Sequence, residues 1–229
     1  MSATDPRSPA PSIDELLIAD EPERWAGLGF EVAGESCELG GVRVRLLGRG
    51  SGGEGRGIVR WSLRGVAGVE LDGLPTVRSE SPVREPGPAH PNGVLGVDHV
   101  VAFSPDLDRS VRTLRAAGLD LRRIREEPTP AGAPRQAFFR LGAEILEVVQ
   151  EPGGSFDFET DRARPARFWG LALNVRDLDE TVAGLGERVG SIRPAVQRGR
   201  RIATLRRSAG LAVPVALMSL RADGASGPC

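Results

Sequence analysis

Few side chains in this sequence can carry acid–base, metal-ligating or nucleophilic chemistry. Its 229 residues include two histidines, His90 and His99, and two cysteines, Cys37 and Cys229. All 30 basic residues are arginines, and neither lysine nor tyrosine occurs. These absences exclude Schiff-base and P-loop lysines and tyrosine acids. A Cys/His zinc site within one chain is excluded as well, because only these residues could build it and their spacing is wrong.

Charge and composition narrow the class of protein further. The 31 acidic residues balance the 30 arginines and are mixed with them along the chain, which is not the basic pattern of a nucleic-acid-binding protein. The N-terminal residues lack a signal-peptide pattern, no apolar run could span a bilayer, and the distant cysteines form no disulfide framework. We therefore expect a cytoplasmic protein with neither nucleic acid nor membrane as a partner.

Proline and glycine divide the chain into a smaller N-terminal and a larger C-terminal part. Residues 1–11 are rich in Pro and Ser and are expected to be a disordered tail. Residues 78–95 hold four prolines and two glycines, which is typical of a linker. The expected folded regions are therefore 12–77 and 96–220, followed by a flexible tail over 221–229.

Two segments of the C-terminal part open with the same pattern. Residues 97–103 predict a strand, and the helix expected next begins at a Ser104 cap, carries apolar residues at i, i+4 and i+7, and closes at Gly118. The order returns 71 residues later, with a strand over 168–175 and a helix over 178–190. An Asp-Leu-Asp tripeptide stands at the start of both helices. Short strands are then expected at 120–124, 136–141 and 144–149 in the first copy and at 191–196, 201–206 and 213–220 in the second.

Each copy is therefore predicted to be a β-α-β-β-β module, and the N-terminal part is predicted to contain a partial repeat of this module. It is expected to begin with a strand over 13–19 and a helix over 21–28. A turn and a strand over 29–32 then lead to a hairpin over 37–47, and a further strand is expected over 57–65. We interpret this part as one abbreviated module and a fragment of another.

Paired βαβββ modules are the signature of the vicinal oxygen chelate superfamily, which includes glyoxalase I, bleomycin-resistance proteins and extradiol dioxygenases. The segment GVDHVVAFSPDLDRSVRTLRAAGL resembles that family's first strand and helix, and RQAFFRLGAEILEVVQ resembles its closing hairpin. The resemblance covers residues 94–220 and, less closely, 12–77. It implies an α+β fold in which the modules form a curved mixed-sheet cup with the helices outside. It does not imply a particular reaction.

In metal-using relatives each module supplies a ligand from its first strand and another from its last. The resemblance places His99 and Glu147 at these positions in the first module. The second module has Gly170 and Ala216 there, and the N-terminal part has Arg45 in place of the Glu. A His/Glu pair alone is a poor site for a divalent cation. The implied metal site is therefore a half-site, and a bound divalent metal ion stays open as the cofactor.

Two roles for the His99–Glu147 pair remain open at this point. The pair could act as base and acid or hold a metal with outside help, or it could be a structural relic that lines a binding cup. Phe138 or Phe168 could form a wall for an apolar ligand. Arg201, from the arginine-rich segment near the C-terminus, is the candidate for a ligand carboxylate or phosphate, since guanidinium groups suit both.

Three other features are predicted to have no catalytic role. Residues 48–53 match GxGxxG, but strands precede and follow them, whereas a dinucleotide-binding loop must open a helix. His90 is expected to be a turn residue in the linker. Cys37 is expected to have no histidine beside it and so to be no nucleophile.

Two classes of function fit these observations. One is an enzyme acting on a small oxygenated metabolite, either through proton transfer or as a metal-dependent lyase, isomerase or dioxygenase. The other is a non-catalytic binding or sequestration protein like the bleomycin-resistance members of the family. The partner is a small molecule in both cases, and a homodimer is left open. A purely structural scaffold is the third alternative.

Overall fold

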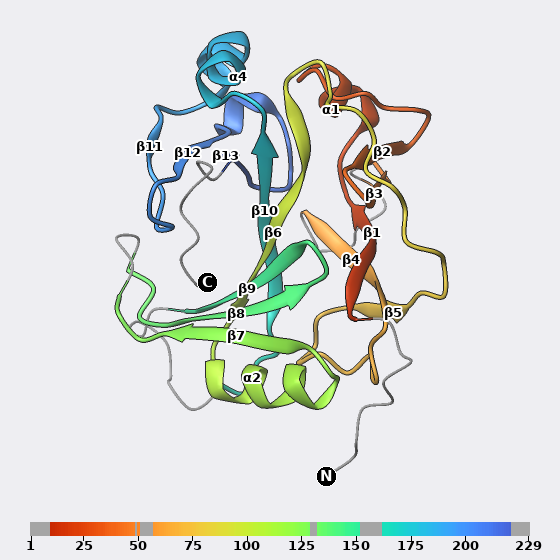
Figure 1. The fold of residues 1–229 in the computed structure, drawn as a ribbon, viewed down its shortest axis with the longest axis vertical. Coiled ribbons are helices and arrows are strands. Elements are labelled where there is room, and N and C mark those ends of the chain that lie inside the picture. Colours follow the sequence, from red (N-terminus) through yellow and green to blue (C-terminus); the bar gives the residue numbers. More distant parts are fainter. Residues whose placement is uncertain (1–9, 49, 51–56, 129–131, 152–161, 221–229) are drawn as a thin grey trace.

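The computed structural model describes residues 10–48, 50, 57–128, 132–151 and 162–220. The predicted tails therefore fall almost wholly outside the described residues, as does most of the GxGxxG segment. The described chain forms two β-sheets, one of eight strands and one of five (Figure 1). No helix in this part of the chain is long and apolar enough to cross a membrane.

The eight-stranded sheet consists of two βαβββ modules. The first module comprises β6 (Val94–Ser104), α2 (Leu107–Ala116), β7 (Asp120–Arg125), β8 (Gln136–Leu141) and β9 (Glu144–Gln150). The second comprises β10 (Arg167–Val175), α4 (Leu178–Leu185), β11 (Arg193–Pro194), β12 (Arg201–Thr204) and β13 (Val215–Ser219), with 3-10 turns at Gly186–Arg188 and Arg207–Ala209. The strand order is β11-β12-β13-β10-β6-β9-β8-β7.

The two modules are joined through their first strands. In each module the last strand lies parallel to the first, as β9 does to β6 and β13 to β10, while β6 and β10 run antiparallel at the centre of the sheet. The helices α2 and α4 lie at opposite ends of the molecule in Figure 1, and the sheet bends strongly between them. This arrangement confirms the predicted α+β fold of paired modules in a curved mixed sheet.

Side-chain alternation along β6 gives the sheet two unlike faces. Val100, Ala102 and Ser104 are fully buried on one face, in a core that also contains Leu114 of α2. The side chains that alternate with them, His99, Val101 and Phe103, point to the other face. We call this second face the concave face, because it lies opposite the packed helices and on the inner side of the curve.

The N-terminal sheet repeats the same plan in shortened form. Its elements are β1 (Ser12–Ile18), α1 (Pro22–Ala26), β2 (Ser36–Leu39), β3 (Val42–Leu46), β4 (Ile58–Arg64) and β5 (Thr76–Arg78), in the order β2-β3-β1-β4-β5. The last strand β3 is parallel to β1, the central neighbour β4 is antiparallel to β1, and β5 is parallel to β4. The strand expected over 29–32 does not form, and only a bridge between Ala33 and Ser36 stands in its place.

The N-terminal sheet packs against the core face of the larger sheet. Trp61 of β4 meets Phe168 of β10 edge-on, with 5.1 Å between ring centroids. At another contact a Cβ on Gly96 would lie 3.2 Å from the Cα of Gly40, so glycine lets the two backbones touch. One buried apolar cluster runs through both sheets. The concave face is left to the two complete modules.

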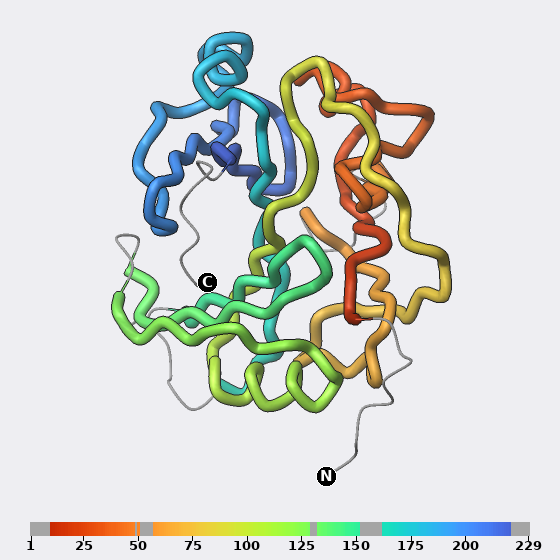
Figure 2. The backbone as a smooth tube through the Cα atoms, in the orientation of Figure 1, coloured from red at the N-terminus to blue at the C-terminus, as the bar shows by residue number. Residues whose placement is uncertain are grey.

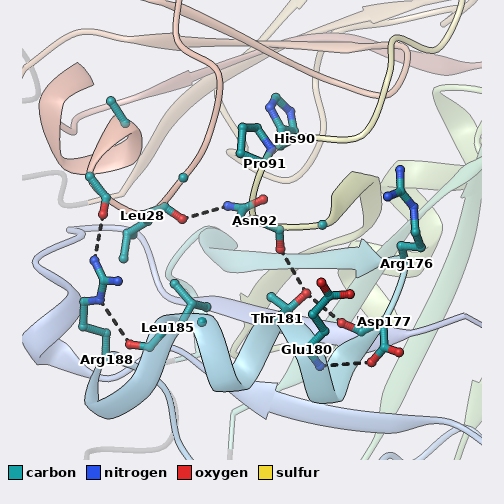
Figure 3. Close-up of a pocket in the computed structure, with 15 residues that line it drawn as sticks. Leu28, His90, Pro91, Asn92, Arg176, Asp177, Glu180, Thr181, Leu185 and Arg188 are labelled. Carbon is teal, nitrogen blue, oxygen red and sulfur yellow. Dashed lines mark hydrogen bonds between the residues drawn. The ribbon is translucent and has the colours of Figure 1, made fainter.

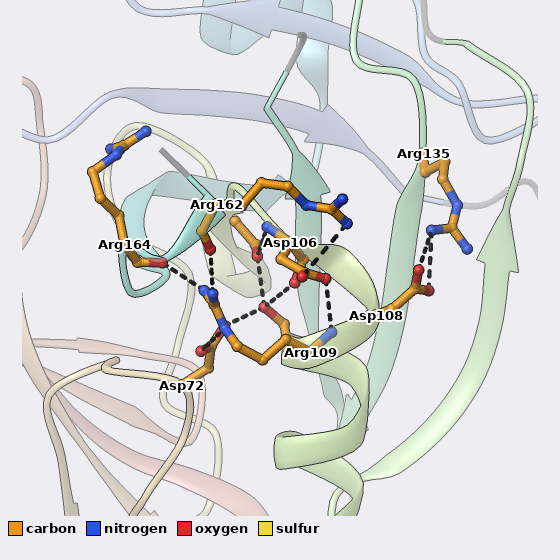
Figure 4. A network of polar contacts seen from close by, with 9 residues as sticks. Asp72, Asp106, Asp108, Arg109, Arg135, Arg162 and Arg164 are labelled. Atoms are coloured by element: carbon orange, nitrogen blue, oxygen red, sulfur yellow. Dashed lines mark hydrogen bonds and ion pairs between the residues drawn. The ribbon is translucent and has the colours of Figure 1, made fainter. Parts of the chain in front are cut away.

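Polar contacts reinforce this packing. Figure 4 shows Arg109 of α2 with its Nε 2.7 Å from Oδ1 of Asp72, while its other nitrogens donate to the carbonyls of Arg162 and Arg164. The segment between β5 and β6 runs along the N-terminal sheet (Figure 2), where Arg84 donates to the backbone carbonyl of Asp14. Arg109 thus ties α2 both to the N-terminal half and to the chain that enters β10.

Candidate functional site

His99 lies where β6 has one residue more than its partner strand. His99 pairs with Ala172 and Val97 with Leu173, so Asp98 has no partner and forms a β-bulge. Bulges re-aim side chains and are common next to active sites. Here the bulge lets the side chain of Asp98 contact the side chain of the next residue, with 2.7 Å between Oδ2 of Asp98 and Nδ1 of His99.

The other ring nitrogen of His99 faces Glu147, as the sequence predicts. Nε2 of His99 lies 3.3 Å from Oε2 of Glu147. Glu147 is in register with Val101 across the parallel β6–β9 pair, which places it on the concave face. Gln136 of β8 donates from Nε2 to the other carboxylate oxygen of Glu147. Burial raises the pKa of Glu147, although the charge of His99 acts in the opposite direction.

An arginine from the second module completes the arrangement. Arg200 is only 5% exposed, and its Nη1 lies 2.7 Å from Oδ1 of Asp98. It also donates to Oδ1 of Asn174 at 2.6 Å and to the carbonyl of Ser219 at 2.8 Å. We refer to Asp98, His99, Gln136, Glu147 and Arg200 as the His99 cluster.

The protonation of Asp98 follows from these neighbours. Its burial acts to raise its pKa, but the hydrogen bond with His99 and the charge of Arg200 outweigh burial and hold the pKa below its usual value. Asp98 is therefore a carboxylate at neutral pH. Because Nδ1 of His99 makes this hydrogen bond, Nε2 is the ring nitrogen that faces Glu147.

The matching positions of the second module offer no ligands. The bulge of β10 is at Trp169, 71 positions after Asp98, so Gly170 is the equivalent of His99. A Cβ at Gly170 would lie 2.5 Å from the carbonyl oxygen of Pro214, which leaves no room for a side chain. Ala216 pairs with Ala172 as Glu147 pairs with Val101, so an alanine stands where the second carboxylate would be.

These residues do not fit a divalent cation. No group of three or more metal-ligating side chains exists among the described residues. Both nitrogens of His99 already face carboxylates, and the guanidinium of Arg200 brings a positive charge to Asp98. A hard cation requires more oxygen ligands than this set supplies.

The three residues predicted to bind a ligand lie in different environments. Phe138 pairs with Glu147 across β8 and β9 and so shares the concave face, where the Arg123 guanidinium lies 5.0 Å from its ring centroid. Phe168 points to the opposite face, against Trp61. This corrects the expectation that Phe168 lines the cup.

Arg201 also lies outside the cup. It shares the core side of β12 with the fully buried Ala203, and its Nη1 pairs with Asp179 of α4 at 3.0 Å. Alternation therefore directs Arg200, and not Arg201, toward the His99 cluster. The role of His99 and Glu147 in catalysis stays a prediction.

The prediction that no histidine lies beside Cys37 is wrong. Sγ of Cys37 is 3.9 Å from Nε2 of His90. That nitrogen is also 3.0 Å from the carbonyl of Glu38, while Nδ1 of His90 accepts a hydrogen bond from the backbone of Glu31. Burial raises the pKa of Cys37 to about 12, so the thiol stays protonated and is no nucleophile.

Two cavities of the described structure lie outside the His99 cluster. The larger, of about 490 Å³, lies at the seam between the N-terminal half and α4, where Asn92 donates to the carbonyl of Leu28 and Arg188 to that of Gly27 (Figure 3). It contains no residue of the His99 cluster. The smaller, of about 280 Å³, is lined by Arg123, Ile124, Arg125, Glu127 and Val196. Its walls come from β7 and from the chain after β11, which are opposite edges of the sheet, so the sheet curls until its edges approach.

Comparison with known proteins gives structural likeness only. No family model and no curated protein matches the sequence. Methylmalonyl-CoA epimerase from Mycobacterium tuberculosis is 21% identical, with a TM-score of 0.47 over 59% of this chain and 94% of that one. A hypothetical protein from Bacillus halodurans is 15% identical, with a TM-score of 0.45 over 56% and 96%. A Streptomyces coelicolor methylmalonyl-CoA epimerase variant in complex with 2-nitronate-propionyl-CoA is 22% identical, with a TM-score of 0.44 over 55% and 97%.

The topology itself identifies the fold. Two βαβββ modules, paired through antiparallel first strands in one curved sheet, are the architecture of the vicinal oxygen chelate superfamily. This chain has that fold. It adds a shortened copy of the plan at its N-terminus and has a glycine and an alanine at the positions of the second module that match His99 and Glu147.

Proposed function

We propose that this protein binds a small oxygenated metabolite on its concave face, and that His99 and Glu147 contact the ligand without a metal ion. The observation that carries the proposal is the buried His99–Glu147 pair, with 3.3 Å between Nε2 and Oε2. Burial of such groups is costly unless they are paired. Here Asp98, Gln136 and Arg200 supply the partners that hold the pair in place.

The pair offers a ligand both a donor and an acceptor. With Nδ1 of His99 directed at Asp98, a proton held between Nε2 of His99 and Oε2 of Glu147 would lie at the concave face. A hydroxyl or carbonyl oxygen that approaches this proton can accept a hydrogen bond, and a hydroxyl can donate one to the carboxylate. Adjacent oxygens on a small metabolite match such a pair.

Gln136 supports the same interpretation. Its side chain is 5% exposed, and Oε1 has no hydrogen-bond partner within the described residues. Buried acceptors are normally satisfied, so a ligand donor that reached this enclosed atom after a shift of its neighbours would gain a hydrogen bond. Because Nε2 of the same amide holds Glu147, the acceptor lies next to the carboxylate.

An acid–base enzyme is the second candidate, favoured by the alignment of Asp98, His99 and Glu147. Asp98 fixes the tautomer and orientation of the imidazole, as the carboxylate does in other histidine-dependent sites. Such a site could catalyse proton transfer in an isomerase or a lyase. A metal-dependent lyase, isomerase or dioxygenase would need ligands that Gly170 and Ala216 do not provide. The binder without turnover would be a sequestration protein, and a homodimer would be compatible with either function.

A thermal-shift screen with small hydroxy and keto acids tests the proposal. We expect hits to raise the melting temperature of the wild type, and His99→Gln and Glu147→Gln to abolish the shift. Glu144→Gln is the matched control, because Glu144 is another buried glutamate of β9 but lies on the opposite face. Equal shifts for every hit in all four proteins would refute the proposal. NMR of the hits with the wild type then separates turnover from binding alone.

A further inference from the structure

An exposed aromatic cluster lies on the concave face beyond His99. Trp169 of β10 stacks on Phe103 of β6, with ring centroids 4.7 Å apart and planes inclined by 20°. The guanidinium of Arg167 lies 5.1 Å from the centroid of Phe103 and 5.8 Å from that of Trp169. We call these three residues the aromatic platform.

The exposure of Trp169 sets it apart in this chain. Trp25 and Trp61 are 0% exposed, whereas Trp169 is 44% exposed. The residue lies at the β-bulge of β10 and shares the concave face with Arg167, which is two positions before it. Leaving an indole ring in water forgoes the free energy that burial would give. An exposed indole ring beside a β-bulge is therefore more typical of a ligand contact than of packing.

The platform is continuous with the His99 cluster. Phe103 and His99 lie on the same side of β6 and are four residues apart, which is about 13 Å along a strand. Between them this face carries Val101, and across the strand pair Gly170, which has no side chain. A single extended small molecule could therefore contact both ends without crossing a bulky side chain of these central strands.

We infer that the aromatic platform binds a planar aromatic or heteroaromatic ring of the ligand, whose oxygenated end reaches the His99 cluster. The inference rests on the proposed function, since it specifies the ligand of the same cup. Trp169 and Phe103 are nearly parallel and stacked, so a third ring can extend the stack on the outer face of the exposed Trp169 ring. The charge of Arg167 is shared with Glu151 at 3.2 Å, so stacking contributes more than charge to recognition.

The surroundings of Trp169 favour a small molecule over a protein partner. The other exposed large apolar side chains among the described residues are Val69, Val83, Val196 and Leu220. None of them lies on β6 or β10, so Trp169 is not part of a broad apolar patch of the kind that protein interfaces use. Phe138 provides a second partly exposed ring on the same face, opposite Glu147.

Indole N–H signals in two-dimensional NMR of the full chain provide the test. The indole nitrogens of Trp25 and Trp61 are engaged with Asp20 and Thr76, so these two signals serve as internal controls. Addition of 2-naphthoate should shift the Trp169 signal, and the saturated analogue decahydro-2-naphthoate should not. We expect Trp169→Ala to weaken naphthoate binding about tenfold, and Trp169→Phe to retain most of it.

The controls separate this inference from the proposed function. Val69→Ala truncates another exposed apolar residue and should leave naphthoate binding unchanged. The inference would be overturned if the saturated analogue bound equally well or if Trp169→Ala left naphthoate binding unchanged. It would also be overturned if the Trp169 signal responded only to protein concentration, which would indicate self-association through this ring. If His99→Gln leaves all oxygenated hits unchanged while Trp169→Ala abolishes naphthoate binding, the proposed function fails and the ring site stands. If His99→Gln abolishes binding of the oxygenated hits while Trp169→Ala leaves naphthoate binding unchanged, the ring site fails and the proposed function stands.

Discussion

Replacement of Glu144 by glutamine should stabilise the protein at neutral and alkaline pH but not at acidic pH. Glu144 begins β9, is 9% exposed and points toward the core side, where the two sheets meet. Burial raises its pKa from 4.5 to about 7, and the charge of Arg64 lowers the pKa only in part. The carboxyl group is therefore harder to ionise in the folded protein than in the unfolded chain.

The sign and size of the effect follow from this difference. A raised carboxyl pKa means that the folded state retains a proton that the unfolded state releases, so stability falls as pH rises through 4.5 and levels off above about 7. The gap between these two pKa values corresponds to an upper limit of about 3 kcal/mol. Glutamine keeps the shape of the side chain and cannot ionise. Glu144→Gln should therefore gain up to about 3 kcal/mol over the wild type between pH 4.5 and pH 8.

Urea unfolding followed by circular dichroism at pH 4.5 and pH 8 measures this gain. The difference in unfolding free energy between Glu144→Gln and the wild type should be larger at pH 8. Glu80→Gln is the control, because Glu80 is an exposed carboxylate in the segment between the sheets. A difference for Glu144→Gln that is equal at both pH values would show that burial does not hold this proton, and the reasoning would be refuted.

Four further substitutions test other parts of the structure. Gly170→Ala should lower the melting temperature, because its Cβ would lie 2.5 Å from the Pro214 carbonyl, and an unchanged melting curve would contradict the close contact. Phe139→Ala should cost about 3–5 kcal/mol in urea unfolding, since Phe139 is fully buried, and a loss below 1 kcal/mol would argue against the core described. Arg109→Ala should speed hydrogen exchange in α2, which equal exchange rates would disprove. Arg201→Ala should change neither the melting temperature nor the binding of any hit, because the residue is exposed and faces away from the cup. Loss of ligand binding in this variant would show that Arg201 faces the cup after all.

The sequence predicts the modules well because their strands alternate regularly and their helices are amphipathic. The strand expected over 136–141 forms with those bounds, and the neighbouring strands differ by a residue or two. Helix ends are less well predicted. Asp106, not Ser104, caps α2 by accepting from the backbone N–H of Arg109, and Ser104 instead accepts from that of Asp106. The second helix ends at Leu185, because Gly186 adopts a positive φ of 57°.

The candidate site is predictable only as far as regular alternation extends. Alternation places His99 and Glu147 on one face, where the structure brings them within 3.3 Å. It would place Asp98 on the other face, and the β-bulge that turns Asp98 toward His99 has no signature in the residues themselves. Arg200 precedes β12 and reaches the site through contacts between distant segments, so only the tertiary structure reveals it. The contact of Gln136 with Glu147 could have been predicted from the β8–β9 hairpin. Gln136 pairs with Val149, which lies two residues after Glu147 on the same face of β9.

The contact between Gly170 and Pro214 also bears on how this chain can change by mutation. Any residue other than glycine at 170 places a Cβ 2.5 Å from a main-chain oxygen, and a main-chain atom cannot turn aside as a flexible side chain can. A substitution of Gly170 by histidine alone therefore cannot place an imidazole at the position of the second module that matches His99. The chain entering β13 would have to move first, and that step alone brings no new ligand. Position 170 is in this sense closed to every side chain while the chain entering β13 keeps its present course.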